Sequence, residues 1–92
     1  MKIAIVTGAS SGMGREFARY IAAEEYLDEL WIIARRADRL KDLKDEIEGN
    51  SGDLRVRPIA LDLTKAESID RLQEGLAKCR PNVKVLVNAS GF

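Results

Sequence analysis

Histidine is absent from this 92-residue chain, and cysteine, proline and aromatic residues are scarce. Without histidine, the commonest side chain for acid–base catalysis and metal binding is missing. The single cysteine, Cys79, excludes an internal disulfide and a cysteine cluster for a metal ion. We therefore expect no metal site, and this sparing use of cysteine is typical of a reducing compartment such as the cytoplasm.

The chain also has no excess of one charge and no long apolar run. Fifteen basic residues balance fifteen acidic ones, so no overall field argues for binding to nucleic acid or to a membrane surface. No apolar segment approaches the roughly 18–20 residues of a membrane-spanning helix. The apolar stretch after Lys2 ends at Gly8 and is too brief for a signal peptide. A hydrophobic content of 46% instead indicates one small globular domain.

What the chain does contain is a glycine-rich segment, around which the rest of the sequence is organised. Residues 2–14 read KIAIVTGASSGMG. The run 3–6 predicts a strand that is covered on both faces, because no polar residues alternate with the apolar ones. Gly8, Gly12 and Gly14 then predict a tight turn into a helix.

This turn is suited to binding an anion. The free backbone amides at the start of the helix, near Met13, and the positive end of the helix dipole favour a group such as a pyrophosphate. Ser10 and Ser11 add hydroxyls that can hydrogen-bond phosphate oxygens. The alternative is a tight strand-to-helix turn that binds no ligand.

Helical patterns and short apolar runs alternate along the rest of the chain. Because Pro58 cannot donate to a ladder, the strand that contains it is predicted at an edge of the sheet. This alternation predicts an α/β fold with right-handed crossovers: a partial, three-layer Rossmann-type parallel sheet in the order 3-2-1-4. Helices are predicted at 15–25, 37–48 and 65–79, and the three later strands at 30–34, 54–60 and 83–88.

Apolar residues at three- and four-residue steps predict which face of each helix packs on the sheet. Thr64 and Glu67 form a capping box, which predicts that the third helix begins near Lys65. Cys79 falls on the inner face of that helix, so we expect a small core residue rather than a reactive thiol. The predicted inner residues are Met13, Phe17, Ala18 and Ile21 on the first helix, Leu40, Leu43 and Ile47 on the second, and Ile69, Leu72, Leu76 and Cys79 on the third.

The end of the second predicted strand bears on the choice of cofactor. In a dinucleotide-binding fold, the residue about 20 positions past the glycines meets the adenosine ribose. This chain has Ala34, Arg35 and Arg36 there, and no acid before Asp38. An arginine fork matches a 2′-phosphate, whereas an acid would bind the 2′-hydroxyl of NAD. NADP(H) is therefore favoured over NAD(H). The alternative is that both arginines are ordinary surface charges.

Thr7 and the spacing T-G-x-x-x-G-x-G that begins there resemble the opening motif of the short-chain dehydrogenase/reductase family. Asp62-Leu63-Thr64 is similar to the family's pattern after the third strand, where the aspartate and the following backbone amide contact adenine. For Asp62 the alternative is an acid that merely flanks a helix. Residues 87–91, VNASG, are similar to the N-N-A-G motif that closes the fourth strand. The resemblance covers the whole chain.

The last of these motifs departs from the family's pattern. Asn88 matches the first asparagine, which in the family helps to hold the centre of the sheet beside the cofactor. Ala89 stands where a second asparagine is usual, and Ser90 where alanine is usual. Together with the arginines, the resemblance implies a cofactor site made of Gly8, Ser10, Ser11, Gly12, Met13, Gly14, Arg35, Arg36, Asp62, Leu63, Asn88, Ala89 and Gly91.

Catalytic residues are not predicted. The family's catalytic serine and Tyr-x-x-x-Lys pair lie beyond its fourth strand; there the tyrosine is the general acid toward a carbonyl and the lysine lowers its pKa. Here Tyr20 is followed four positions later by Glu24, and Tyr26 by Leu30. The resemblance therefore implies that residues 1–92 are the N-terminal part of an NAD(P)-binding Rossmann domain, the cofactor-binding half of an NADP(H)-dependent oxidoreductase.

Two other functions stay open: a non-catalytic NADP-binding module used for regulation or interaction, and a fragment that folds without binding. The fourth strand bears on partners, because in the family a fifth strand lies beside it. An apolar edge with unpaired backbone groups, on which Lys84 is the only charge, is a template for another chain. We expect self-association through 83–87, or contact with a separate chain that carries the missing C-terminal half.

Overall fold

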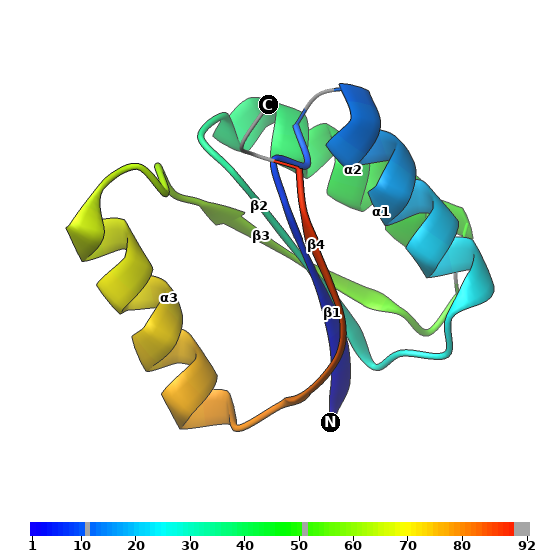
Figure 1. The fold of residues 1–92 in the computed structure, drawn as a ribbon. Helices are drawn as coiled ribbons and strands as arrows, with labels where there is room; N and C mark the ends of the chain where they lie inside the picture. Colours follow the sequence, from blue (N-terminus) through cyan, green and yellow to red (C-terminus); the bar gives the residue numbers. More distant parts are fainter. Residues whose placement is uncertain (11, 51, 90–92) are drawn as a thin grey trace.

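The computed structural model describes residues 1–10, 12–50 and 52–89 of the chain. Strands and helices alternate along it, and the strands form one parallel sheet in the order β3-β2-β1-β4 (Figure 1). This confirms the predicted order and places Pro58 on an edge strand. The strands are β1 (Lys2–Thr7), β2 (Glu29–Ala34), β3 (Arg55–Ala60) and β4 (Asn82–Asn88), and the helices are α1 (Gly12–Glu24), α2 (Ala37–Asn50) and α3 (Ala66–Cys79).

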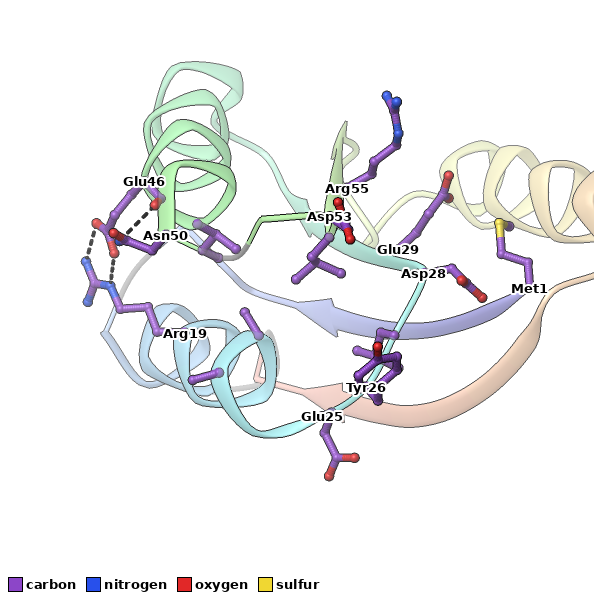
Figure 2. Close-up of a pocket in the computed structure, with 15 residues that line it drawn as sticks. Met1, Arg19, Glu25, Tyr26, Asp28, Glu29, Glu46, Asn50, Asp53 and Arg55 are labelled. Atoms are coloured by element: carbon purple, nitrogen blue, oxygen red, sulfur yellow. Dashed lines mark hydrogen bonds and ion pairs between the residues drawn. The ribbon is translucent and has the colours of Figure 1, made fainter.

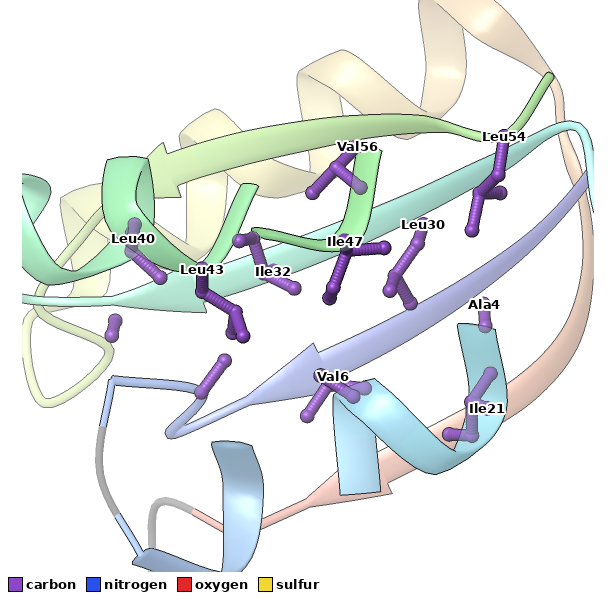
Figure 3. Packing of buried hydrophobic residues seen from close by; sticks show 13 residues of the cluster. Ala4, Val6, Ile21, Leu30, Ile32, Leu40, Leu43, Ile47, Leu54 and Val56 are labelled. Carbon is purple, nitrogen blue, oxygen red and sulfur yellow. The ribbon is translucent and has the colours of Figure 1, made fainter. Parts of the chain in front are cut away.

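The sheet is the middle of three layers. α1 and α2 cover one face and α3 lies on the other (Figure 1). Apolar side chains pack at both interfaces, as expected for a parallel sheet with helices on its two faces, but the packing under α3 is sparser. The second face has a smaller core around Trp31, against which Leu72 and Leu76 of α3 pack. The first core, shown in Figure 3, joins Ala4, Val6, Leu30, Ile32 and Val56 of the sheet to Ile21 of α1 and to Leu40, Leu43 and Ile47 of α2.

β4 is the other edge of the sheet. Its register against β1 shifts between Ile3 and Ala4, whose partners are Val83 and Val85, so one extra residue of β4 lies opposite β1 there. Val85 packs against the first core, whereas the Leu86 side chain is 67% exposed. Within the described residues no strand pairs with the outer side of β4.

The predicted inner face of α1 is wrong in part. Ala18 and Ile21 are buried, but Met13 is 62% exposed and Phe17 41% exposed, and Gly14 is buried instead. Small residues face the sheet because α1 lies very close to the end of β1. Within the described residues, α2 is the one helix that α1 contacts, so the side that carries Met13 and Phe17 stays uncovered.

The predicted bounds of α3 are close to the observed ones, but the predicted capping box and the predicted burial of Cys79 are wrong. The residue that caps its start is Lys65, in an extended conformation and without a side-chain capping bond, so Thr64 and Glu67 form no capping box. The Thr64 hydroxyl donates instead to Asp62. At the other end Cys79 is exposed and lies near the Arg57 guanidinium, outside the core.

The predicted inner face of α3 is right for Leu72 and Leu76, which pack against the second core, but not for the first turn of the helix. Ser68 is buried, whereas Ile69 is 43% exposed. A pattern of apolar residues alone cannot place a buried serine. Across the described parts of the chain, no helix is both long enough and apolar enough to cross a membrane.

Candidate cofactor-binding site

The carboxyl ends of the strands are held together by backbone hydrogen bonds. The amide of Ala9 donates to the carbonyl of Ile33 at 3.2 Å, and the amide of Leu61 donates to that of Ala34 at 2.9 Å. On the other side of β1, the amide of Ala89 donates to Thr7 at 3.1 Å. The segments that follow β1, β3 and β4 therefore meet at the carboxyl edge of the sheet, where the strands end. Ligands of open α/β sheets bind at this place.

The glycine-rich turn begins α1 directly beyond this edge. Gly12 has a φ of +46°, and a Cβ built on it would meet no atom within 4 Å, so the turn is open there. Gly14 is the opposite case, because a Cβ on it would lie 2.1 Å from the carbonyl oxygen of Gly8. One glycine thus leaves room beside the backbone, and the other lets the helix approach the strand. Ser10 is half-buried in this turn, and Ser11 lies outside the described residues.

The start of α1 fits an anionic group such as a pyrophosphate. Its first turn contains no acidic residue, so no side chain there cancels the positive end of the helix dipole. The amides of the first helical turn have no partner within the helix and are available to phosphate oxygens. Met13 lies in this turn with its side chain exposed.

Arg35 and Arg36 follow β2 directly and are both exposed. The Arg36 guanidinium donates from Nε and Nη2 to the two carboxylate oxygens of Asp38, each at 3.4 Å. The hydrogen bond from Arg36 is the largest cause that holds the pKa of Asp38 below its usual value, and the backbone amide of Arg39 adds to it. Two cations therefore stand where the ribose of a dinucleotide is expected.

Asp62 lies at the next strand end. Its Oδ1 accepts hydrogen bonds from the Thr64 amide at 3.0 Å and from the Thr64 hydroxyl at 2.6 Å. These bonds lower the pKa of Asp62, and the charge of Arg35 lowers it further. Asp62 therefore fixes the turn before α3 with its carboxylate ionised. Leu63, next to it, is half-buried against the core of the second face.

Thr7 and Asn88 join β1 to β4 at the same edge. The Thr7 hydroxyl donates to the Asn88 side-chain oxygen at 2.9 Å, and Thr7 is only 7% exposed. Thr7 is a residue of this edge that the predicted site lacks, although its place in the T-G motif is a signal that could have found it. Ala89 is half-buried beside this pair, and Gly91 lies outside the described residues.

A large hollow among the described residues lies at the opposite end of the sheet. It has a volume of about 1070 Å³ and lies among the amino ends of β1, β2 and β3 and the last turns of α1 and α2 (Figure 2). Glu46 in its wall is held by Arg19, with bonds of 2.6 and 3.0 Å. Asp28 accepts the Lys2 amide at 2.6 Å. These acids hold neighbouring elements together, so the hollow does not compete with the glycine-rich edge as the candidate site.

Comparisons with known proteins identify the family that this chain is similar to. The sequence pattern of the short chain dehydrogenase family matches residues 2–92. A very-long-chain 3-oxoacyl-CoA reductase of Pyricularia oryzae is 33% identical over 88 residues, which make up 96% of this chain and 26% of the reductase.

Solved structures give the same result. L-Sorbose reductase from Gluconobacter frateurii, complexed with NADPH and L-sorbose, superposes with a TM-score of 0.84 at 31% identity, over 99% of this chain and 34% of that one. An alcohol dehydrogenase of the archaeon Thermococcus sibiricus, complexed with 5-hydroxy-NADP, gives 0.80 at 35% identity, over 94% of this chain and 35% of that one. The chain thus spans about a quarter to a third of the length of these relatives.

Proposed function

This chain belongs to the short chain dehydrogenase family, and on that basis we propose that it forms the NADP(H)-binding half of an oxidoreductase that acts on a carbonyl–alcohol pair. The observation that carries the proposal is the meeting of an open, amide-rich helix start with two arginines at one edge of the sheet. When bound, the nicotinamide supplies or accepts the hydride. Relatives whose structures were solved with NADPH or 5-hydroxy-NADP support the choice of cofactor.

The residues of this chain bind and orient the cofactor in this proposal. The turn at Gly12 and the amides of α1 hold the pyrophosphate, because the amides of a first helical turn have no partner within the helix. Arg35 and Arg36 bind the 2′-phosphate. Asp62 and the Leu63 amide contact adenine, as the family resemblance implies.

The choice of cofactor can be measured directly. NADPH should bind this chain about 10- to 150-fold more tightly than NADH at low salt, the range of a charge-assisted hydrogen bond. Arg35→Asp should reverse that preference, because a carboxylate repels the 2′-phosphate of NADPH and accepts a hydrogen bond from the 2′-hydroxyl of NADH. Arg71→Asp, on the exposed surface of α3, is the matched control and should change neither affinity. Equal affinities of the unmutated chain for the two cofactors would contradict the assignment.

A non-catalytic binding module is the second candidate function. These 92 residues contain no Tyr-x-x-x-Lys motif, which is expected under both candidate functions. The reading frame beyond Phe92 separates the two candidates, because a downstream serine and Tyr-x-x-x-Lys establish an enzyme. A third possibility, a fragment that does not bind at all, is tested by the same NADPH titration.

We also propose that β4 associates with a second copy of this chain. Its residues 83–87 have no strand partner on the outer side within the described residues, and Leu86 among them is 67% exposed. Light scattering over a concentration series should show a mass that rises above that of the monomer. Leu86→Lys should keep the chain monomeric, because two lysines would meet across the paired edges.

Leu86 serves this test better than Val85, since Val85 packs against the first core and its replacement by lysine would also disturb the fold. Glu74→Lys is the matched control, because it also introduces a lysine but does so on the exposed surface of α3, away from β4. That variant should not change the mass. An unmutated chain that stays monomeric at every concentration would show that the edge does not associate.

A further inference from the structure

The two arginines after β2 differ in what surrounds them. The fork of Arg36 lies against the carboxylate of Asp38, with two contacts of 3.4 Å. For Arg35 the structure gives no side-chain hydrogen bond or ion pair among the described residues, and Asp62 acts on it through charge alone. Two neighbours of the same residue type are therefore unequal before any ligand binds.

Asp38 is held in place without Arg36. It lies in the first turn of α2, where the helix dipole favours a negative charge. The carboxylate therefore stays near this edge even when the arginine moves. Asp38 occupies the Nε and Nη2 donors of Arg36, so a phosphate group that approaches Arg36 must displace Asp38 from this fork or bind the remaining N–H groups beside a negative charge.

Both side chains of the pair are exposed, at 60% for Arg36 and 69% for Asp38. Water and salt screen an ion pair in such a position, so its strength is small compared with that of a buried pair. The competition therefore adjusts the affinity for a phosphate and does not abolish it.

We propose that Asp38 is a specificity-determining residue, which weakens the contribution of Arg36 to binding the 2′-phosphate and leaves Arg35 as the main ligand of that group. The inference rests on the proposed function, because it presupposes that NADP(H) binds at this edge. It predicts an order of effects: loss of Arg35 weakens NADPH binding more than loss of Arg36, and loss of Asp38 strengthens it.

The test is a titration of NADPH and NADH at low salt with the unmutated chain, Arg35→Gln, Arg36→Gln, Asp38→Asn and the double variant with Arg36→Gln and Asp38→Asn. Asp38→Asn should tighten NADPH binding about two- to fivefold, the range of an exposed ion pair, and leave NADH unchanged. In the Arg36→Gln background the same change should have no effect, because the competition is already removed.

Two further variants control for structure and for net charge. Asp38→Ser keeps a hydrogen-bond acceptor at the start of α2 and should give the same gain in NADPH affinity. It replaces Asp38→Asn in the test if that variant does not fold. Asp42→Asn removes an exposed acid one turn further along α2 and should leave both affinities unchanged. The gain from Asp38→Asn should also shrink as salt is added.

Each contrary outcome has its own meaning. Weaker NADH binding with unchanged NADPH binding would make Asp38 a ligand of the ribose hydroxyl and overturn the inference. If Asp38→Asn still tightened NADPH binding in the Arg36→Gln background, Asp38 would act only as a general negative charge and not by competing for Arg36. An unmutated chain that prefers NADPH, combined with no effect of Asp38→Asn or Asp38→Ser, would overturn the inference alone. An unmutated chain with no preference, or with no binding, would overturn the proposed function as well.

Discussion

Replacing Gly14 with alanine should destabilise the fold by more than about 3 kcal/mol, because overpacking against a rigid neighbour is among the largest single-residue effects. The new Cβ would lie 2.1 Å from the carbonyl oxygen of Gly8 and 2.7 Å from its carbonyl carbon. Both are backbone atoms, so no side chain can turn away, and α1 must move off β1. Urea unfolding followed by circular dichroism measures the loss.

Gly75→Ala is the matched control for this change. Gly75 lies inside α3, and a Cβ built on it would meet no atom within 4 Å. The same substitution should therefore stabilise the chain by about 0.5–1 kcal/mol, through a better helix propensity. If both variants changed stability by similar amounts, α1 would not approach β1 as closely as the structure has it.

No reductase turnover is expected from this chain alone. General acid catalysis contributes roughly 10²- to 10⁴-fold to such reactions, and the positioning of the substrate contributes further. The family's acid and lysine are not among these 92 residues. NADPH oxidation in the presence of simple aldehydes should therefore stay at the rate without protein, while a complete relative assayed in parallel oxidises NADPH with its own substrate.

Tyr20 and Tyr26 are the tyrosines of this chain, and their side chains are 65% and 96% exposed. Tyr20→Phe and Tyr26→Phe should leave that background rate unchanged. Sustained NADPH oxidation that disappears in either variant would show that a tyrosine of this chain does act as an acid, and the division into a binding and a catalytic half would be wrong.

The order of the sheet followed from features that are local in the sequence. Apolar runs mark the strands, the helices between them impose parallel crossovers, and Pro58 identifies one edge. These features depend on few neighbours, so the sequence could predict them. The positions of the glycine-rich turn and of Arg35 at one edge follow from the same rule, since parallel strands end together.

The inner faces of the helices were harder to predict. Met13 and Phe17 stand four residues apart, and so do Gly14 and Ala18 next to them. Periodicity cannot choose between two such rows. The row with Gly14 and Ala18 faces the sheet, because α1 comes too close to Gly8 for a large side chain to fit between them. The pair of Arg36 and Asp38 was equally hidden, because it depends on how two exposed side chains turn.

The pairing of β1 with β4 sets the order in which the sheet can be completed during synthesis. The amide of Asn82 donates to the carbonyl of Met1 at 2.7 Å, so the first residue of the chain is bonded to one that is made about eighty residues later. A ribosome adds roughly 5–20 residues per second. Until Asn88 has emerged, β1 has β2 on one side and an open ladder on the other. In the nascent chain β1 is therefore an edge strand, although in the folded chain it lies between β2 and β4.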